Sequence, residues 1–222
     1  MIESDQTAGQ GRTARAEQRR RHLLDVARRL FVQQGFHQTG VAQIAAESEI
    51  KVGQIYRDFE SKEAIIAAIC DLDVATWLEE DVLAAAVQQN DVPAIRAWLA
   101  RFGQPHDTEE YRLVAEIMAE AGRNERIAAS YRTLDKRILN SLSAALVAIA
   151  PADTDRAAIE GLAQLILTFG VGMASRQIVH GEAGSRAACR MMDRVLTSEI
   201  VTLFRCHVPV DPDGPVCQHE AG

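Results

Sequence analysis

The 222-residue sequence has few features that would build a sheet or cross a membrane. Runs of β-branched residues are rare, and strict alternation of apolar and polar residues over five or more positions is hard to find, which argues against strands. The longest apolar run, Leu165 to Ala174, falls short of the roughly 20 residues that a membrane helix needs. The polar, arginine-rich N-terminus has no apolar segment typical of a signal peptide. These absences predict a soluble, cytoplasmic protein.

Cysteine is also scarce, and the four cysteines show no paired metal-type spacing. We expect reduced thiols rather than disulfides at Cys70, Cys189, Cys206 and Cys217. Cys206-His207 and Cys217 with His219 resemble metal-ligand pairs, but no second pair with ligand spacing supports a site. No metal and no cofactor is therefore predicted.

Motifs that carry enzyme chemistry are missing. There is no Gly-x-Gly-x-x-Gly, no phosphate-binding loop and no Gly-x-Ser-x-Gly turn, and none of the six histidines follows a Glu at the spacing of a di-iron site. Glu116 and Glu120 fall on one helix face, which we interpret as a solvated acidic face. No catalytic residue is predicted and the protein is not expected to be an enzyme. An all-helical enzyme and a helical scaffold with an incidental three-helix head remain the alternatives.

The charge is distributed unevenly along the chain. The net charge is −7, yet residues 12–62 hold ten Lys or Arg against six Asp or Glu, whereas residues 63–222 hold fourteen against twenty-three. A basic N-terminal part on an acidic body is the asymmetry expected when one end of a molecule meets phosphate. The cluster Arg19 to Arg21 is either a solvated face or a phosphate contact.

The composition and the spacing of apolar residues favour helices. Alanine, leucine, arginine and glutamate dominate, and all favour helix, so the fold class is predicted to be all-α. Apolar residues at three- and four-residue spacing predict helices over 16–34, from Ser61 onward, 93–102, 127–149, 154–180 and 185–205. Pro151 and the glycines from Gly181 to Gly184 separate the last three.

The segment from His37 to Lys62 has the pattern of a helix-turn-helix. Thr39 is a suitable N-cap. Val41, Ile44 and Ala45 have the spacing of a buried face, and Ile55 and Phe59 resume it on a second helix. Long polar side chains lie between these apolar positions, as on a helix that offers donors to the major groove: Lys51, Gln54, Tyr56 and Arg57.

Over residues 20–70 this pattern resembles the DNA-binding domain of the TetR/AcrR family of bacterial repressors. The family pattern is a Thr that opens the second helix, an Ile-Ala pair and a Gly-x-x-Tyr-x-x-Phe-x-x-Lys run, found here as Thr39, Ile44-Ala45, Gly53, Tyr56, Phe59 and Lys62. Three positions depart from it: Glu49 replaces a turn Gly, Lys51 a capping Ser, and Asp58 a Tyr or His.

The resemblance implies a ligand-responsive transcriptional regulator. We expect a repressor that binds a near-palindromic operator as a homodimer and is released by a small, mostly apolar molecule. Gln54 and Arg57 are predicted to face the groove with Lys51 at its entrance. Thr39, Tyr56 and Lys62 are predicted to hold phosphates, with packing against the first helix as the alternative for Tyr56.

The resemblance also suggests the domain organisation. We expect a disordered arm over 1–14, the DNA-binding domain over 15–62, a ligand-binding and dimerisation domain over 63–206, and a flexible tail over 207–222. Small residues on the penultimate helix form a seam that suits either a neighbour in the chain or a partner subunit. The family's four-helix dimer interface favours the partner, and the predicted contacts are Ala163, Leu167, Gly170, Ala174, Met192 and Val195.

A ligand pocket is predicted among the body helices. Its expected lining consists of bulky side chains near helix centres, for each of which ordinary core packing is the alternative: Trp77, Trp98, Phe102, Tyr111, Met118, Tyr131 and Phe169. Arg176 is a candidate charge partner for an acidic group, or a surface ion pair. Aromatic residues make up only 5% of the chain, so a mostly apolar cavity is favoured over an aromatic cage for a flat cation.

Overall fold

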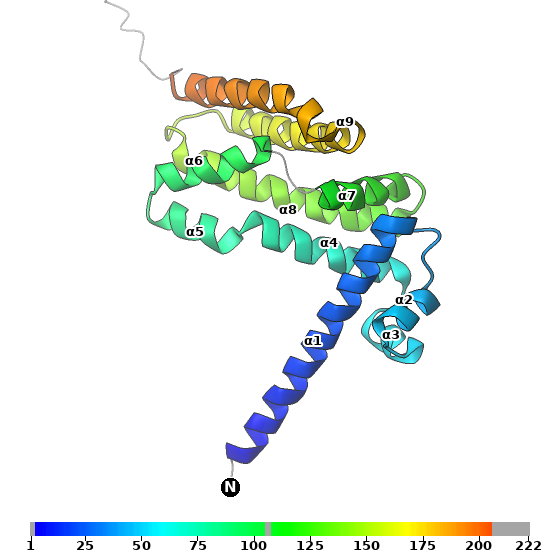
Figure 1. Ribbon diagram of the computed structural model, residues 1–222. Coiled ribbons are helices and arrows are strands. Elements are labelled where there is room, and N and C mark those ends of the chain that lie inside the picture. The colour runs from blue at the N-terminus through cyan, green and yellow to red at the C-terminus, as the bar shows by residue number, and fades with distance from the viewer. Residues whose placement is uncertain (1–2, 105–107, 206–222) are drawn as a thin grey trace, which may run out of the picture.

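The structure is a computed structural model that describes residues 3–104 and 108–205, and within these ranges it contains helices and no strand (Figure 1). This confirms the predicted all-α class. The helices are α1 (Glu3–Gln34), α2 (Val41–Ser48), α3 (Val52–Asp58), α4 (Lys62–Leu78), α5 (Glu80–Gln88), α6 (Val92–Ala100), α7 (Thr108–Ala121), α8 (Glu125–Ile149) and α9 (Arg156–Arg205), with a 3₁₀ turn at Arg101–Gly103.

The C-terminal half of α1 packs with α2 and α3 into a small N-terminal head (Figure 1). α1 begins at Glu3, so the segment expected to be a disordered arm over 1–14 is helical from that residue onward. The predicted cap is also corrected. Gly40, not Thr39, occupies the N-cap of α2 and gives no side-chain hydrogen bond, while the Thr39 hydroxyl donates to the Gly35 carbonyl at 2.9 Å.

The body begins with α4, which is continuous with the head as the sequence predicts. It ends at Leu78, and Glu79 adopts a left-handed conformation (φ 47°) that starts α5, a break that the sequence did not reveal. The indole nitrogen of Trp98 donates to the Leu78 carbonyl at 2.5 Å. The Trp98 indole, twenty residues further along the chain, thus satisfies a carbonyl that the end of α4 leaves open.

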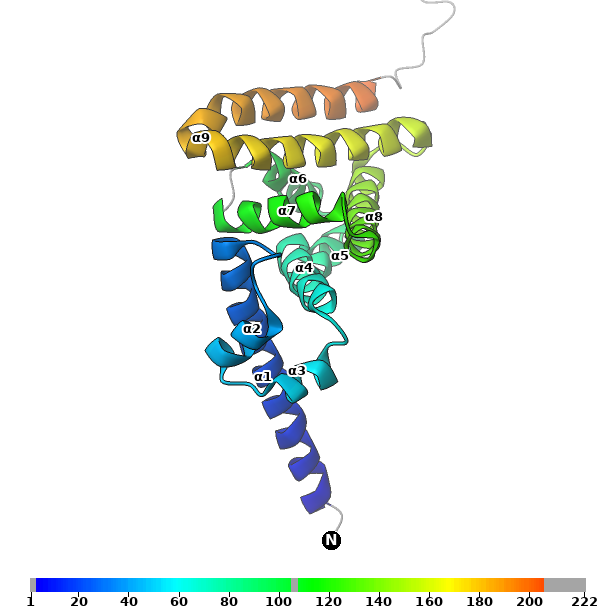
Figure 2. The same ribbon diagram turned by 90° about the vertical axis from the view of Figure 1, so that its right-hand side faces the viewer.

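The last helix, α9, is a hairpin of two arms. Gly181 has non-helical torsions (φ 68°, ψ 178°), and the two arms run antiparallel and side by side on either side of it (Figure 2). This agrees with the two predicted helices. By length and composition alone residues 156–201 would suit a membrane, which is weak evidence, and α9 packs here on α7 and α8. The predicted tail over 207–222 lies outside the described residues.

The buried side chains form two clusters. The first joins head residues such as Leu30, Phe31 and Ile44 to Ile65 and Ile69 of α4 and reaches α7 and α8. The second fills the body between α4, α6, α8 and α9. The head core thus continues past the predicted domain boundary at residue 62. A movement of α4 or α7 would therefore be transmitted to the head through direct packing contacts.

Candidate nucleic-acid interface and body cavity

One face of α3 is open to solvent. Ile55 is 1% exposed and anchors the helix in the head, whereas Tyr56 is 54% exposed. Tyr56 is therefore mostly open to solvent, which disfavours the alternative of packing against α1. The exposed positions on this face are Lys51, Val52, Gly53, Tyr56 and Arg57. The outward face thus carries the groove-entry residue Lys51 and the donor Arg57 predicted from the sequence.

The two side chains predicted to read bases, Gln54 and Arg57, are hydrogen-bonded to each other. Arg57 donates to the Gln54 side-chain oxygen, and the Gln54 amide donates to both Asp58 carboxylate oxygens, at 3.1 and 3.2 Å. The Arg19 guanidinium lies 3.8 Å from the same carboxylate. Asp58, which departs from the family pattern, thus fixes the orientation of the pair predicted to face the groove. Gln54 is half-buried, whereas Arg57 is exposed.

Two predicted phosphate contacts are corrected. Thr39 is fully buried, and its hydroxyl is used within the α1–α2 loop. The Lys62 ammonium donates to the Phe36 carbonyl at 2.6 Å and to the Thr39 carbonyl at 3.1 Å, and it lies 4.1 Å from the centre of the Phe36 ring. Desolvation lowers the pKa of Lys62, and the charges of Glu63 and Glu120 partly offset this. Both residues shape the head instead of facing outward.

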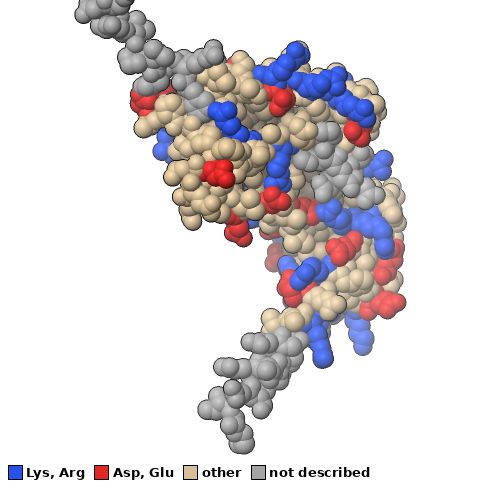
Figure 3. Space-filling model, turned by 60° about the vertical axis from the view of Figure 1, so that its left-hand side comes forward, with Lys and Arg blue, Asp and Glu red and all other residues tan. Residues whose placement is uncertain are grey.

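The arginine cluster of α1 is divided between packing and solvent. The Arg20 guanidinium lies 4.3 Å from the centre of the Phe59 ring, and Arg19 faces Asp58, whereas Arg21 is exposed. On the face in Figure 3, lysine and arginine side chains project from the lower edge of the coloured part and mix with acidic ones above it. On this face, the described residues therefore offer discrete cationic points rather than a continuous basic surface.

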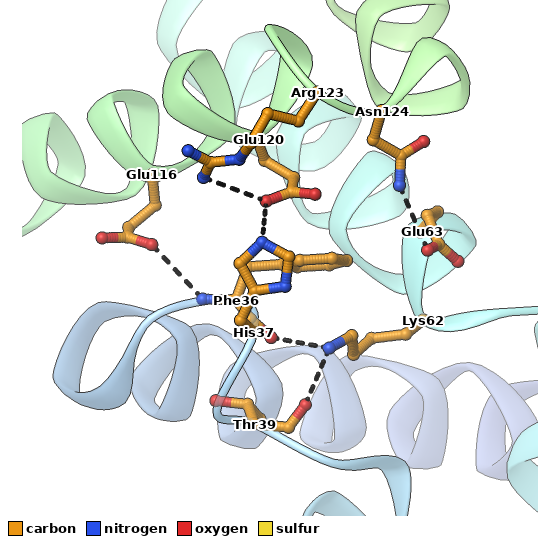
Figure 4. A network of polar contacts seen from close by, with 9 residues as sticks. All are labelled: Phe36, His37, Thr39, Lys62, Glu63, Glu116, Glu120, Arg123 and Asn124. Atoms are coloured by element: carbon orange, nitrogen blue, oxygen red, sulfur yellow. Dashed lines mark hydrogen bonds and ion pairs between the residues drawn. The ribbon is translucent and has the colours of Figure 1, made fainter.

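A polar network joins the head to α7 and the start of α8 (Figure 4). The backbone amide of Phe36 donates to Glu116 at 3.3 Å, and the His37 Nε2 atom lies 2.7 Å from Glu120. Arg123 contacts the same Glu120 carboxylate at 3.4 Å. The Asn124 amide donates to Glu63, in the first turn of α4, at 3.3 Å.

This network corrects the interpretation of Glu116 and Glu120 as a solvated acidic face. Glu120 is 4% exposed, and both carboxylates bind the α1–α2 loop. Gly35 in that loop has φ +81°, and a Cβ there would lie 3.1 Å from a Glu116 oxygen. The loop and α7 therefore fit closely. Sequence spacing placed the two Glu side chains on one face, but no local signal showed that another element covers it.

The body contains a cavity of about 190 Å³, partly open to the outside, between α4, α7, α8 and the first arm of α9. Trp77, Phe102, Tyr111 and Tyr131 line it, as the sequence predicted for each. Trp77 and Phe102 meet edge to face with ring centres 4.6 Å apart. The remaining wall is mostly aliphatic and includes Leu113, Ile117, Leu134 and Ile138.

The other predicted lining residues lie elsewhere. Trp98 is buried beside Phe102, with ring centres 5.2 Å apart, but faces the Leu78 carbonyl instead of the cavity. Met118 and Phe169 are 38% and 39% exposed, because the turns that carry them bring other residues to the inner face. Arg176 is exposed on α9, away from the cavity.

Two carboxylates that sequence reasoning missed line the cavity, Asp73 of α4 and Asp135 of α8. Asp73 forms an ion pair with Arg28 of α1. Burial alone raises the pKa of Asp135, and no hydrogen bond or ion pair to its carboxylate occurs among the described residues. The sequence did contain a signal that the Asp135 side chain faces the interior. Asp135 lies four residues after Tyr131 and three before Ile138, within the apolar stripe of α8.

The predicted dimer seam faces the protein's own interior. Ala163, Ala174 and Met192 are 1%, 6% and 1% exposed, and Leu167 and Gly170 are cavity-lining residues. Val195 is half-buried. The opposite side of the first arm of α9 is open instead, with Leu165 and Phe169 37% and 39% exposed and no neighbouring atom within 4 Å of a Cβ built at Gly161 or Gly172.

Cys70 and Cys189 are buried and free, and burial raises the pKa of Cys70 to about 12. Such thiols are unreactive. Within the described ranges no three His, Cys, Asp or Glu side chains gather as a metal site. The pairs around Cys206 and Cys217 lie outside those ranges.

Comparison with known proteins agrees with the geometry of the head. Residues 23–69 match the family described as "Bacterial regulatory proteins, tetR family". The chain is 33% identical over 118 residues to the HTH-type transcriptional regulator UidR of Escherichia coli, covering 51% of this chain and 57% of UidR. It is 33% identical over 105 residues to AcrR of Shigella flexneri, covering 46% of this chain and 49% of AcrR. The matches thus span about half the length of these curated relatives.

Solved structures extend the similarity to the whole fold. Salmonella enterica GusR is 27% identical, with a TM-score of 0.61 over 85% of this chain and 96% of that chain. A putative transcriptional regulator from Saccharomonospora viridis, solved in complex with choline, is 20% identical, with a TM-score of 0.59 over 83% of this chain and 96% of that chain. Residues 23–69 therefore carry the N-terminal domain of the TetR family, and the fold as a whole is shared with solved transcriptional regulators.

Proposed function

We propose that the protein is a transcriptional regulator that binds a near-palindromic operator as a homodimer, represses from it, and is released when a small molecule fills the body cavity. The observation that carries the proposal is the open face of α3. It presents Lys51, Tyr56 and Arg57 to solvent while Ile55 fixes the helix in the head core. A short helix held in this way offers one row of side chains to the major groove.

Specific and non-specific contacts divide along this face. Arg57 is the candidate base contact, because a guanidinium bonds guanine through two acceptors. Lys51 and Tyr56 flank it and are suited to phosphates, which position the protein without reading sequence. Arg21 on α1 is exposed and supplies a further cation. Since the head has few free cations, we expect only a moderate salt dependence, with a slope of roughly 0.9 per phosphate contacted.

The cavity supplies the regulatory part of the proposal. α7 presents Tyr111 and Ile117 to the cavity and Glu116 and Glu120 to the α1–α2 loop. A molecule that moves α7 therefore moves the contacts that hold the head. The choline complex of the Saccharomonospora viridis protein supports small-molecule binding by this fold. Release is then a population shift toward a conformation in which the two recognition helices of the dimer are wrongly spaced for DNA.

The enzyme and scaffold alternatives have less support. The family to which residues 23–69 belong consists of regulators, and the cavity is lined mainly by apolar and aromatic side chains. We propose that the protein is not an enzyme and acts in the cytoplasm, where operator DNA is found.

The test begins with selection of bound sequences from random DNA, followed by fluorescence anisotropy on the selected site. We expect a palindromic consensus, a complex of two chains per site, and affinity that falls with salt. Arg126→Ala, on an exposed position of α8, is the matched control for head variants. Selection that yields no consensus, with binding equal on all sequences, would contradict the proposal.

A further inference from the structure

The walls of the cavity are charged with one sign only. Asp73 and Asp135 line it, and among the described residues no Lys, Arg or His does so. The rest of the lining is apolar or aromatic, and its other polar side-chain groups are the hydroxyls of Tyr111 and Tyr131, the indole N–H of Trp77 and the Cys70 thiol. An anionic ligand would be repelled in such a place, and a neutral one would leave the Asp135 carboxylate without a charge partner.

Asp135 is the more informative of the two. Its carboxylate has no hydrogen-bond or ion-pair partner among the described residues, and burial disfavours its charged form. The carboxylate also acts on its neighbour, because the charge of Asp135 contributes to the raised pKa of Tyr131, second to burial. A partly desolvated carboxylate beside aromatic rings lacks the cation that such groups normally gain in a folded protein.

We propose that the cavity selects an organic cation, with an ammonium group bound to Asp135 and Asp73 and an apolar or aromatic body against Trp77, Tyr111 and Tyr131. This inference rests on the proposed function, since it names the chemical class of the effector. The cavity remains mostly apolar, as the sequence predicts, and the effector differs from the expected apolar molecule by a single positive charge. An engineered cavity of about 150 Å³ binds benzene, so the 190 Å³ found here suits one ring with a short aminoalkyl chain.

The second carboxylate connects the effector's charge to the head. Asp73 pairs with Arg28 of α1, and α1 packs against α2 of the helix-turn-helix. An ammonium that shares Asp73 competes with Arg28, which weakens the contact between α1 and α4. Because binding couplings are reciprocal, loss of Arg28 should then strengthen binding of the cation.

Three ligands of nearly equal shape test the charge preference: 2-phenylethylamine, 2-phenylethanol and phenylacetate. Calorimetry on the full-length protein without DNA should find the amine about tenfold tighter than the alcohol, as expected for a charge-assisted hydrogen bond, and phenylacetate weakest. Asp135→Asn should abolish the preference for the amine over the alcohol. Asp71→Asn, on the exposed side of α4, should retain it. Arg28→Gln should tighten the amine several-fold and leave the alcohol unchanged.

The outcomes separate the effector class from the proposed function. The cation assignment is wrong, whatever the protein does on DNA, if the alcohol or phenylacetate binds as tightly as the amine. It is also wrong if the amine does not bind at 10 mM ligand, roughly the weak end of fragment affinity, or if Asp135→Asn keeps the amine preference. An unchanged amine affinity in Arg28→Gln overturns the shared use of Asp73. If the amine binds with the expected preference but never releases operator DNA, cation selection stands and regulated release fails.

Discussion

Arg57 and Gln54 lie one turn apart on α3, yet the structure gives them different freedom. Arg57 ends in solvent, while Gln54 is half-buried and donates to Asp58. The carboxylate of Asp58 thereby holds a donor that the sequence predicts to face the groove. At the scale of single residues, we therefore expect the proposed base contact to depend chiefly on Arg57.

Arg57→Ala should weaken binding to the selected operator by roughly 1–3 kcal/mol and relax the sequence preference at one base pair of each half-site. Binding to random DNA should change less, because phosphate contacts are retained. Anisotropy titrations on operator and scrambled DNA measure both effects. Equal affinity of the variant and the wild type for both DNAs would remove Arg57 from the interface, and Arg126→Ala should be silent.

Asp135 gives a prediction about stability that needs no ligand. Burial raises its pKa in the folded chain, so the folded state binds more protons than the unfolded state between the ordinary value, about 3.9, and the raised value. Its contribution to stability is therefore greatest below that window and falls as pH rises through the folded pKa. Asp135→Asn should raise the free energy of unfolding at pH 7 by about 0.5 kcal/mol, the scale for a partly exposed group.

Urea denaturation of the wild type, Asp135→Asn and Asp71→Asn at pH 7 and pH 4 measures this effect. The gain from Asp135→Asn should shrink at pH 4, where the wild-type carboxyl is partly protonated. A loss of stability at pH 7 would mean that the carboxylate has a stabilising partner in the folded chain.

At the scale of elements, α7 connects the cavity to the head. One side of the helix carries Leu113, Val114 and Ile117 into the cavity, and the other holds the α1–α2 loop through Glu116 and Glu120. Glu120 is buried and also contacts Arg123. A shift of α7 therefore cannot leave the loop unaffected.

Glu120→Gln should reduce the coupling between effector and DNA by about 1 kcal/mol, or roughly fivefold. The amide keeps the shape of the side chain but loses the charge-assisted contact with His37. A double-mutant cycle tests this contact. Operator affinity is measured with and without 2-phenylethylamine for Glu120→Gln, His37→Gln and the double variant. Single and double variants should lose the same coupling. Glu125→Gln, whose side chain is 82% exposed, is the control. Unchanged coupling would place the connection in another element.

At the scale of the whole molecule, the open side of α9 is the surface that a second subunit would use. Leu165 and Phe169 lie one turn apart there, and the nearby Gly161 and Gly172 permit close approach of another helix. The seam predicted from the sequence cannot take this role, because it covers the cavity and the body core.

Phe169→Glu should therefore yield a monomer at low micromolar concentration and reduce operator affinity by about a hundredfold or more, since linked half-sites gain affinity only together. Analytical ultracentrifugation and anisotropy measure the two effects. Ala129→Glu, exposed on α8, is a control for added charge. A dimeric Phe169→Glu protein with wild-type operator affinity would move the interface to another face.

The sequence by itself determined the helical class, the head and most helix ends, because these depend on local spacing, caps and glycine. Ile44, Ile55 and Phe59 are buried as their spacing predicts, and Gly181 separates the two arms of α9. The family pattern in residues 37–62 supports the proposed function. Four of the aromatic residues expected at a ligand pocket line the cavity, while Phe169 at the centre of its helix is exposed, so their binding role stays a prediction.

Only the tertiary structure decided which side of each helix meets which neighbour. Periodicity shows that Glu116 and Glu120 share a face, but not that the α1–α2 loop covers it. It shows small residues along α9, but not that Leu167 and Gly170 line a cavity while Phe169 faces outward. Thr39 and Lys62 match a DNA-binding pattern, yet both bond the chain's own backbone. The physical reason is that a helical repeat fixes directions around one axis, whereas contacts depend on how separate axes cross.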